Sequence, residues 1–189
     1  KYPIGVVTPA ERAAGDALAL ELANEFFGMR GKTQPAYVDP DGAIDIALKE
    51  AGTVVVADPS DNPGGGAPGD ATMILRRMIE RGVTNAALAP IWDPVAVRMC
   101  FMAGVGGKLP LRFGGKTAPT SGQPIDALVT VTQLTRDATQ TFVGAEVPLG
   151  DCAAISVNGI SVVLITKRTQ ALGSDLLTGM GVAIEGKKM

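Results

Sequence analysis

The residues best suited to chemistry lie in one stretch, residues 58–70, with the sequence DPSDNPGGGAPGD. It combines the carboxylates of Asp58, Asp61 and Asp70 with the side-chain amide of Asn62 and a run of glycines. Carboxylates and exposed main-chain amides together suit an ammonium group, an amide or a metal-bound substrate. The chain has no histidine, so it lacks the usual general base and the usual zinc ligand. We therefore assign no catalytic residue in this sequence.

The same stretch matches the dinucleotide-binding pattern G-x-G-x-x-G through Gly64, Gly66 and Gly69. Asp93 lies about 20 residues after these glycines, where dinucleotide-binding sites place an acid that binds ribose. Charge argues against this interpretation, because Asp70 stands at the expected helix N-terminus, where a pyrophosphate would need the amides. A module that binds a nucleotide or another small ligand, without chemistry, remains the alternative function.

Purely structural explanations are also open for this stretch. Asp70 would cap a helix, Asp58 and Asp61 would form Asx-turns, and the glycines would supply positive φ angles. The stretch could equally pack against a partner subunit in an assembly domain. These explanations do not account for its place directly after a predicted strand, at the edge where open α/β sheets bind ligands.

The elements that must position this stretch alternate in the first half of the chain. Capping and apolar periodicity predict helices over residues 9–29, 40–51, 70–81 and 94–103. Continuous apolar runs predict buried strands over residues 53–57 and 85–91. Strands that alternate with helices indicate a parallel βαβ unit.

The second half has the pattern of an antiparallel sheet. Strands are expected over residues 108–113, 127–135, 139–143, 153–157 and 160–166, followed by a short helix at 175–178. Asn158-Gly159 is a strong hairpin signal between the last two strands. Lys116, which leaves a predicted strand, is expected to be a solvated surface charge. The fold class is thus α/β, a mixed sheet with a parallel βαβ unit followed by an antiparallel β-rich half.

Composition excludes several classes of function. The net charge of −2 and the aromatic content of 4% argue against nucleic acid as a partner. No apolar run is long enough to span a membrane. Two cysteines, Cys100 and Cys152, stand in apolar contexts without a disulfide framework, so we expect buried thiols in a cytoplasmic protein.

From about Val55 onward, the sequence resembles the C-terminal domain of the MlrC family, microcystin-degradation proteins classed as zinc metallopeptidases. The resemblance rests first on residues 56–70. It continues in Ile91-Trp92-Asp93-Pro94, in Ala103-Gly104-Val105-Gly106 and in Phe113-Gly114-Gly115-Lys116, which follow in the family's order.

The resemblance implies a two-domain hydrolase that acts on peptide or amide bonds and binds its catalytic zinc in an N-terminal domain absent here. We then expect no zinc site in this chain and no activity of this chain alone. The implied partners are that metal-binding domain and a small peptide-like substrate; a homo-oligomer is left open. Residues expected to line the substrate cleft, where loop amides would orient a carboxylate or amide, are Asp58, Asp61, Asn62, Gly64, Gly65, Gly66, Asp70 and Asp93.

The implied organisation has two parts. Residues 1–38 would be a helix and linker that join the missing upstream domain. Residues 39–189 would be the MlrC-like C-terminal α/β domain, with further strand material expected after Lys188.

Overall fold

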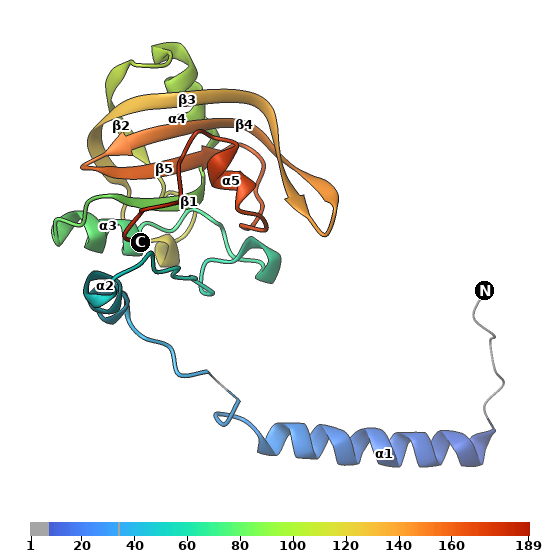
Figure 1. The fold of residues 1–189 in the computed structure, drawn as a ribbon. Helices are drawn as coiled ribbons and strands as arrows, with labels where there is room; N and C mark the ends of the chain where they lie inside the picture. The colour runs from blue at the N-terminus through green and yellow to red at the C-terminus, as the bar shows by residue number, and fades with distance from the viewer. Residues whose placement is uncertain (1–7, 34) are drawn as a thin grey trace. The chain divides into compact units, whose positions relative to one another are not determined.

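The computed structural model of this chain describes residues 8–33 and 35–189. The chain divides into two compact units, Lys1–Tyr37 and Val38–Met189. The second unit contains the sheet and all the residues singled out as site candidates (Figure 1). Among the described helices, none is both long enough and apolar enough to cross a membrane.

The helix of the first unit, α1 (Pro9–Gly28), begins as predicted at a capping box. Glu11 N donates to Thr8 Oγ1 at 3.2 Å, and Thr8 N donates to Glu11 Oε2 at 2.7 Å. Proline at the first helical position supports this start, since it needs no hydrogen-bond acceptor there. No residue of α1 is buried.

Five strands form one curled mixed sheet in the order β1-β5-β4-β3-β2 (Figure 1). β1 and β5 pair in parallel, whereas the other three pairs are antiparallel. The predicted class, a mixed α/β fold, is therefore confirmed. The strands are β1 (Ala86–Trp92), β2 (Lys108–Phe113), β3 (Ile125–Phe142), β4 (Ala145–Val157) and β5 (Ile160–Ile165).

The prediction of a buried strand over residues 53–57 is wrong. These residues lie outside the sheet, and Val55 is 91% exposed. Within the described part of the chain, their bonds to another segment are Val54 N to Lys188 O (3.1 Å) and Thr53 Oγ1 to Lys187 O (2.5 Å). The parallel pair of the fold is β1 with β5, not residues 53–57 with β1.

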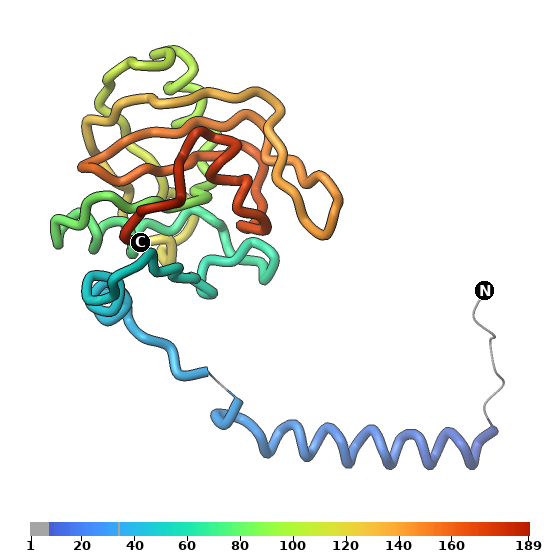
Figure 2. Tube along the Cα trace, in the orientation of Figure 1, coloured from blue at the N-terminus to red at the C-terminus, as the bar shows by residue number. Residues whose placement is uncertain are grey.

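The last residues of the chain lie between residues 53–57 and β1. Lys188 N donates to Asn85 O (2.8 Å) and Ala87 N donates to Met189 O (2.9 Å), so these residues lie along the outer edge of β1 (Figure 2). An apolar, β-branched run favours a strand, but its packing and pairing with neighbours decide whether it becomes one. In the described part of the chain, residues 53–57 bond to Lys187 and Lys188 rather than to a strand of the sheet.

Four helices complete the second unit, and two of them begin as the Asp-Pro pairs predict. Asp39 accepts from Gly42 N at 2.7 Å and Asp93 accepts from Ala96 N at 3.0 Å. The helix predicted from residue 70 begins only at Met73, because Asp70 is bonded elsewhere. The helices are α2 (Pro40–Lys49), α3 (Met73–Glu80), α4 (Pro94–Ala103) and α5 (Asp175–Thr178), with 3₁₀ turns η1 (Pro63–Gly65) and η2 (Pro119–Ser121).

The sheet is covered on both faces, which accounts for the apolar runs of β4 and β5. Alternate residues of β5 point into two different cores: Val162 and Leu164 pack with α2, α3 and α4, whereas Val163 and Ile165 pack with α5. The two-residue turn between β4 and β5 has positive φ at Asn158 (49°) and Gly159 (79°), as the predicted hairpin requires.

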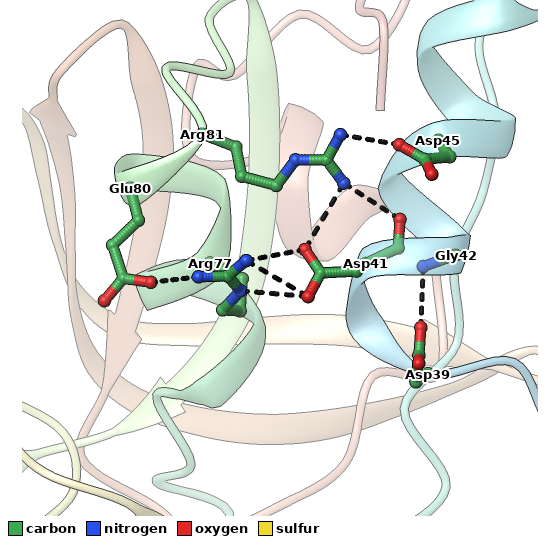
Figure 3. Close-up of polar contacts among 7 residues, drawn as sticks. All are labelled: Asp39, Asp41, Gly42, Asp45, Arg77, Glu80 and Arg81. Atoms are coloured by element: carbon green, nitrogen blue, oxygen red, sulfur yellow. Dashed lines mark hydrogen bonds and ion pairs between the residues drawn. The ribbon is translucent and has the colours of Figure 1, made fainter.

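An ion-pair network joins α2 to α3 (Figure 3). Arg77 Nη2 donates to both oxygens of Asp41, at 2.8 and 3.1 Å. Arg81 pairs with Asp41 and with Asp45, and Glu80 pairs with Arg77. The side chains of Arg77 and its partners are 40% to 49% exposed. Exposed ion pairs contribute little free energy, so the network mainly sets how α2 and α3 face each other and adds little to the stability of the fold.

Candidate functional site

The candidate site is built around the glycine loop, which we define as residues 58–72. The loop returns to the carboxyl end of β1, where Trp92 N donates to Gly69 O at 2.8 Å. Asp93 follows directly on β1 and holds the start of α4. The structure therefore brings the loop and Asp93 to the same edge of the sheet, although β1, not residues 53–57, is the strand that leads there.

The acids of the glycine loop bind the loop itself. Asp61 accepts from Gly69 N (2.8 Å) and from Ala71 N (2.6 Å), and so closes the loop across its base. Asp58 makes the Asx-turn expected of it, since its Oδ1 accepts from Ser60 N at 2.9 Å. Asp61 thus acts as a clamp rather than as an Asx-turn, because its partners lie 8 and 10 residues further on.

The amides at the tip of the loop are also occupied. Gly64 N donates to Asn62 Oδ1 at 2.8 Å. Gly65 N and Ala67 N donate to Asn62 O, and Gly66 N donates to Pro63 O. A phosphate or carboxylate would need these amides unpaired and convergent. The geometry therefore disfavours both the nucleotide interpretation and our expectation that loop amides orient a substrate.

Asp70 is 1% exposed and does not cap a helix. Its Oδ2 accepts from Lys116 N (2.7 Å), Thr117 N (2.9 Å) and Thr117 Oγ1 (2.9 Å). Burial acts to raise the pKa of Asp70, but these donors and the nearby Ser121 hydroxyl outweigh it, so the pKa lies below the ordinary 3.8. An ionised Asp70 thus ties the glycine loop to residues 114–117.

Asp93 makes a second tie to the same segment. Its Oδ2 accepts from Gly114 N at 2.9 Å and from Lys116 Nζ at 2.7 Å. The expectation that Lys116 is a solvated surface charge holds only in part: the residue is exposed, but its ammonium pairs with a carboxylate whose side chain is only 4% exposed. The sequence signal was the Gly114-Gly115 pair, since both residues have positive φ, near 60°, which favours glycine.

The candidates therefore differ in exposure. Asp58 and the tip residues Gly64, Gly65 and Gly66 are exposed, whereas Asp61 and Asn62 are half-buried and Asp70 and Asp93 are buried. Two surface hollows, of about 120 and 250 Å³, lie on other parts of the second unit and are not lined by the loop. The loop thus has an exposed tip, which we call the ledge, and a base that is closed by Asp61 and tied to residues 116–117 by the buried Asp70.

The residues of this site do not fit a zinc ion. Within the described ranges, no group of three or more Cys, Asp or Glu side chains is placed to hold a metal. The buried carboxylates Asp70 and Asp93 accept from N–H donors and from an ammonium group. Such donors direct positive charge at the oxygens that a cation would need.

The mixed sheet, the glycine loop and the Gly-Gly-Lys segment all lie in the part of the chain that matches a known family. Residues 56–189 match the family described as MlrC C-terminus, and the chain belongs to this family. It is 33% identical over 186 residues to Microcystinase C of Sphingomonas sp., a match that covers 97% of this chain and 37% of that protein.

The fold also recurs in a solved structure. A crystal structure from Mesorhizobium sp. BNC1, named "Putative metallopeptidase", aligns with a TM-score of 0.80 at 24% identity. The match covers 89% of this chain and 35% of that one. The chain thus spans just over a third of the length of these two relatives.

Proposed function

We propose that this chain is the C-terminal part of an MlrC-type hydrolase that acts on peptide or amide bonds, and that the glycine loop lines its substrate cleft. The name of Microcystinase C and the name of the Mesorhizobium protein support a hydrolase of this kind. The residues of the site do not fit zinc. A catalytic zinc would therefore be held outside this chain.

One observation carries the proposal: the glycine loop is held rigidly at its base while its tip is left exposed. Asp61 clamps the base, and Asp70 and Asp93 fix the neighbouring segment. Surfaces that must orient a substrate benefit from such prior fixing, because less freedom is lost on binding. A loop that served only as a connection would not need the two buried carboxylates beside it, because burying a carboxylate is costly even where one of its oxygens is well bonded.

The loop tip offers a matched pair of variants. Gly65 and Gly52 both have negative φ, and a Cβ added at either would meet no atom within 4 Å. Gly65→Leu places bulk on the ledge, whereas Gly52→Leu places it outside the loop. In the longer parent protein, with microcystin as the first substrate, we expect Gly65→Leu to lower kcat/KM by roughly tenfold or more, and Gly52→Leu to leave it unchanged.

The zinc content of this chain and of the longer parent protein tests the other half of the proposal. Both would be purified without added metal and dialysed identically. Zinc in the longer protein only is the expected result. Stoichiometric zinc in this chain would overturn the assignment of the ligands, and hydrolysis unaffected by Gly65→Leu would overturn the role of the loop. If neither protein contains zinc and neither hydrolyses the substrate, the results would favour a ligand-binding module instead.

A further inference from the structure

A second segment, far from the glycine loop in sequence, lies against it in space. We define this flanking segment as residues 166–173, which connect β5 to α5 without regular structure. Arg168 Nη1 donates to Ala67 O at 3.1 Å, and Trp92 Nε1 donates to Thr166 O at 2.9 Å. The flanking segment therefore contacts both the loop and the end of β1, beside the proposed cleft.

Gly64 of the loop tip and Gln170 of the flanking segment also lie close together. A Cβ built on Gly64 would overlap Oε1 of Gln170, and would lie 3.0 Å from its Cδ. The φ of Gly64 is not in the left-handed region, so its conformation does not require glycine. The absence of a side chain at Gly64 is instead what allows the Gln170 amide to pack on the loop tip.

The flanking segment is itself held by one buried side chain, Gln140 of β3. Gln140 is 1% exposed. Its Nε2 donates to Gln170 O at 2.8 Å, and its Oε1 accepts from Leu172 N (2.9 Å) and Gly173 N (3.2 Å). A buried amide that bonds to one irregular segment through both its nitrogen and its oxygen fixes the shape of that segment.

We propose that the flanking segment is a second wall of the substrate cleft and that Gln140 and Gln170 are positioning residues for the glycine loop. This inference rests on the function proposed above. Gln140 fixes the backbone at Gln170, and the Gln170 side chain in turn fixes the loop tip at Gly64. The proposed cleft is then lined by the glycine loop and the flanking segment, and the sequence motif marks only the first of these two.

Hydrogen exchange of this chain tests the coupling without any assumption about function. We expect Gln140→Leu to speed exchange of the amides of Gly64, Gly65, Gly66 and Gly69 by roughly tenfold, because local opening sets their protection. The matched control is Gln133→Leu, on the same strand. Gln133 donates to Gly179 O at 3.0 Å, away from the loop, and its loss should leave those amides unchanged.

If Gln140→Leu does not fold, Gln170→Ala decides the question, since Gln170 is only half-buried. Faster exchange at the loop tip in this variant supports the coupling. Unchanged loop exchange, with faster exchange confined to the flanking segment, overturns it.

The role in the cleft is tested in the longer parent protein. We compare Gln170→Ala with Gln133→Leu, provided that the two variants have the same free energy of unfolding. We expect the KM for microcystin to be at least about fivefold higher in Gln170→Ala than in Gln133→Leu. Equal kinetic constants in the two variants would overturn the second wall. A wild-type parent that hydrolyses no peptide would overturn the proposed function, whereas the exchange result would still decide the positioning role.

Discussion

At the scale of single residues, Asp70 and Asp93 hold the site together. Each places a carboxylate in a buried position and surrounds it with donors from distant parts of the chain. Removal of a buried, bonded carboxylate leaves those donors without acceptors. In the proposed cleft, both residues would therefore act only through the segments that they fix.

The stability of the protein should depend on the ionisation of Asp70. Its folded pKa lies below 3.8, so its contribution is complete above about pH 4 and is lost as the pH falls through the folded value. We expect Asp70→Asn to lower the free energy of unfolding by about 2 kcal/mol at pH 7, and by less at pH 3. Urea unfolding at the two pH values measures this. Asp58→Asn, at an exposed turn, is the control; an equal loss there would contradict the argument.

The two cysteines should be inert in the folded protein. Both are free and buried. Burial, aided by Asp93, raises the pKa of Cys100 to about 11, and burial, aided by Asp151, raises that of Cys152 to about 12. Since the thiolate is the reactive form, we expect labelling by a thiol reagent at pH 8 only at the rate of unfolding. Rapid labelling of either residue in the native protein would show an opening that the structure does not contain.

At the scale of elements, the sequence correctly predicts helix starts and turns whose determining contacts lie between neighbouring residues. The Asp-Pro caps of α2 and α4 and the Asn158-Gly159 turn involve neighbouring residues, and each forms where the sequence predicts it. β3 was predicted as two strands, but it continues through a register shift near Asp137, whose φ is 47°. A bulge keeps a strand continuous where polar residues interrupt its pattern.

Elements that depend on contacts between distant residues could not be predicted from the sequence. The start of α3 moves to Met73 because the partners of Asp70 lie 46 and 47 positions away. The loop and Asp93 could be named together from the strands predicted before them, although residues 53–57 form no strand, whereas no such signal marked Gln140 and Gln170. No periodicity shows that a side chain on β3 will bond to residues 170–173.

The contact between α2 and α3 should be sensitive to salt. We expect Arg77→Ala to lower the melting temperature at low ionic strength, because it removes the bidentate pair with Asp41 (Figure 3). The difference from wild type should shrink in 1 M salt, since screening weakens exposed pairs. Thermal unfolding at both salt concentrations measures it. Arg112→Ala, which breaks a more exposed pair with Asp126, should have a smaller effect at low salt.

At the scale of the whole molecule, three segments separated by many positions meet at one edge of a single sheet. The glycine loop, residues 114–117 and the flanking segment 166–173 are joined there by side-chain to main-chain hydrogen bonds. Such an arrangement exists only in the folded chain. A change in the packing of β1 should therefore disturb all three segments together.

The exposed run at residues 53–57 has a consequence for the behaviour of this chain in concentrated solution. An apolar, β-branched segment with little pairing can recruit another molecule and seed intermolecular β-structure. We expect the isolated chain to aggregate as its concentration rises, and Val55→Lys to suppress this. Val105→Lys, at a residue 65% exposed outside any strand, should not. Light scattering across a concentration series distinguishes the two, and equal protection by both lysines would trace aggregation to exposed apolar surface in general rather than to residues 53–57.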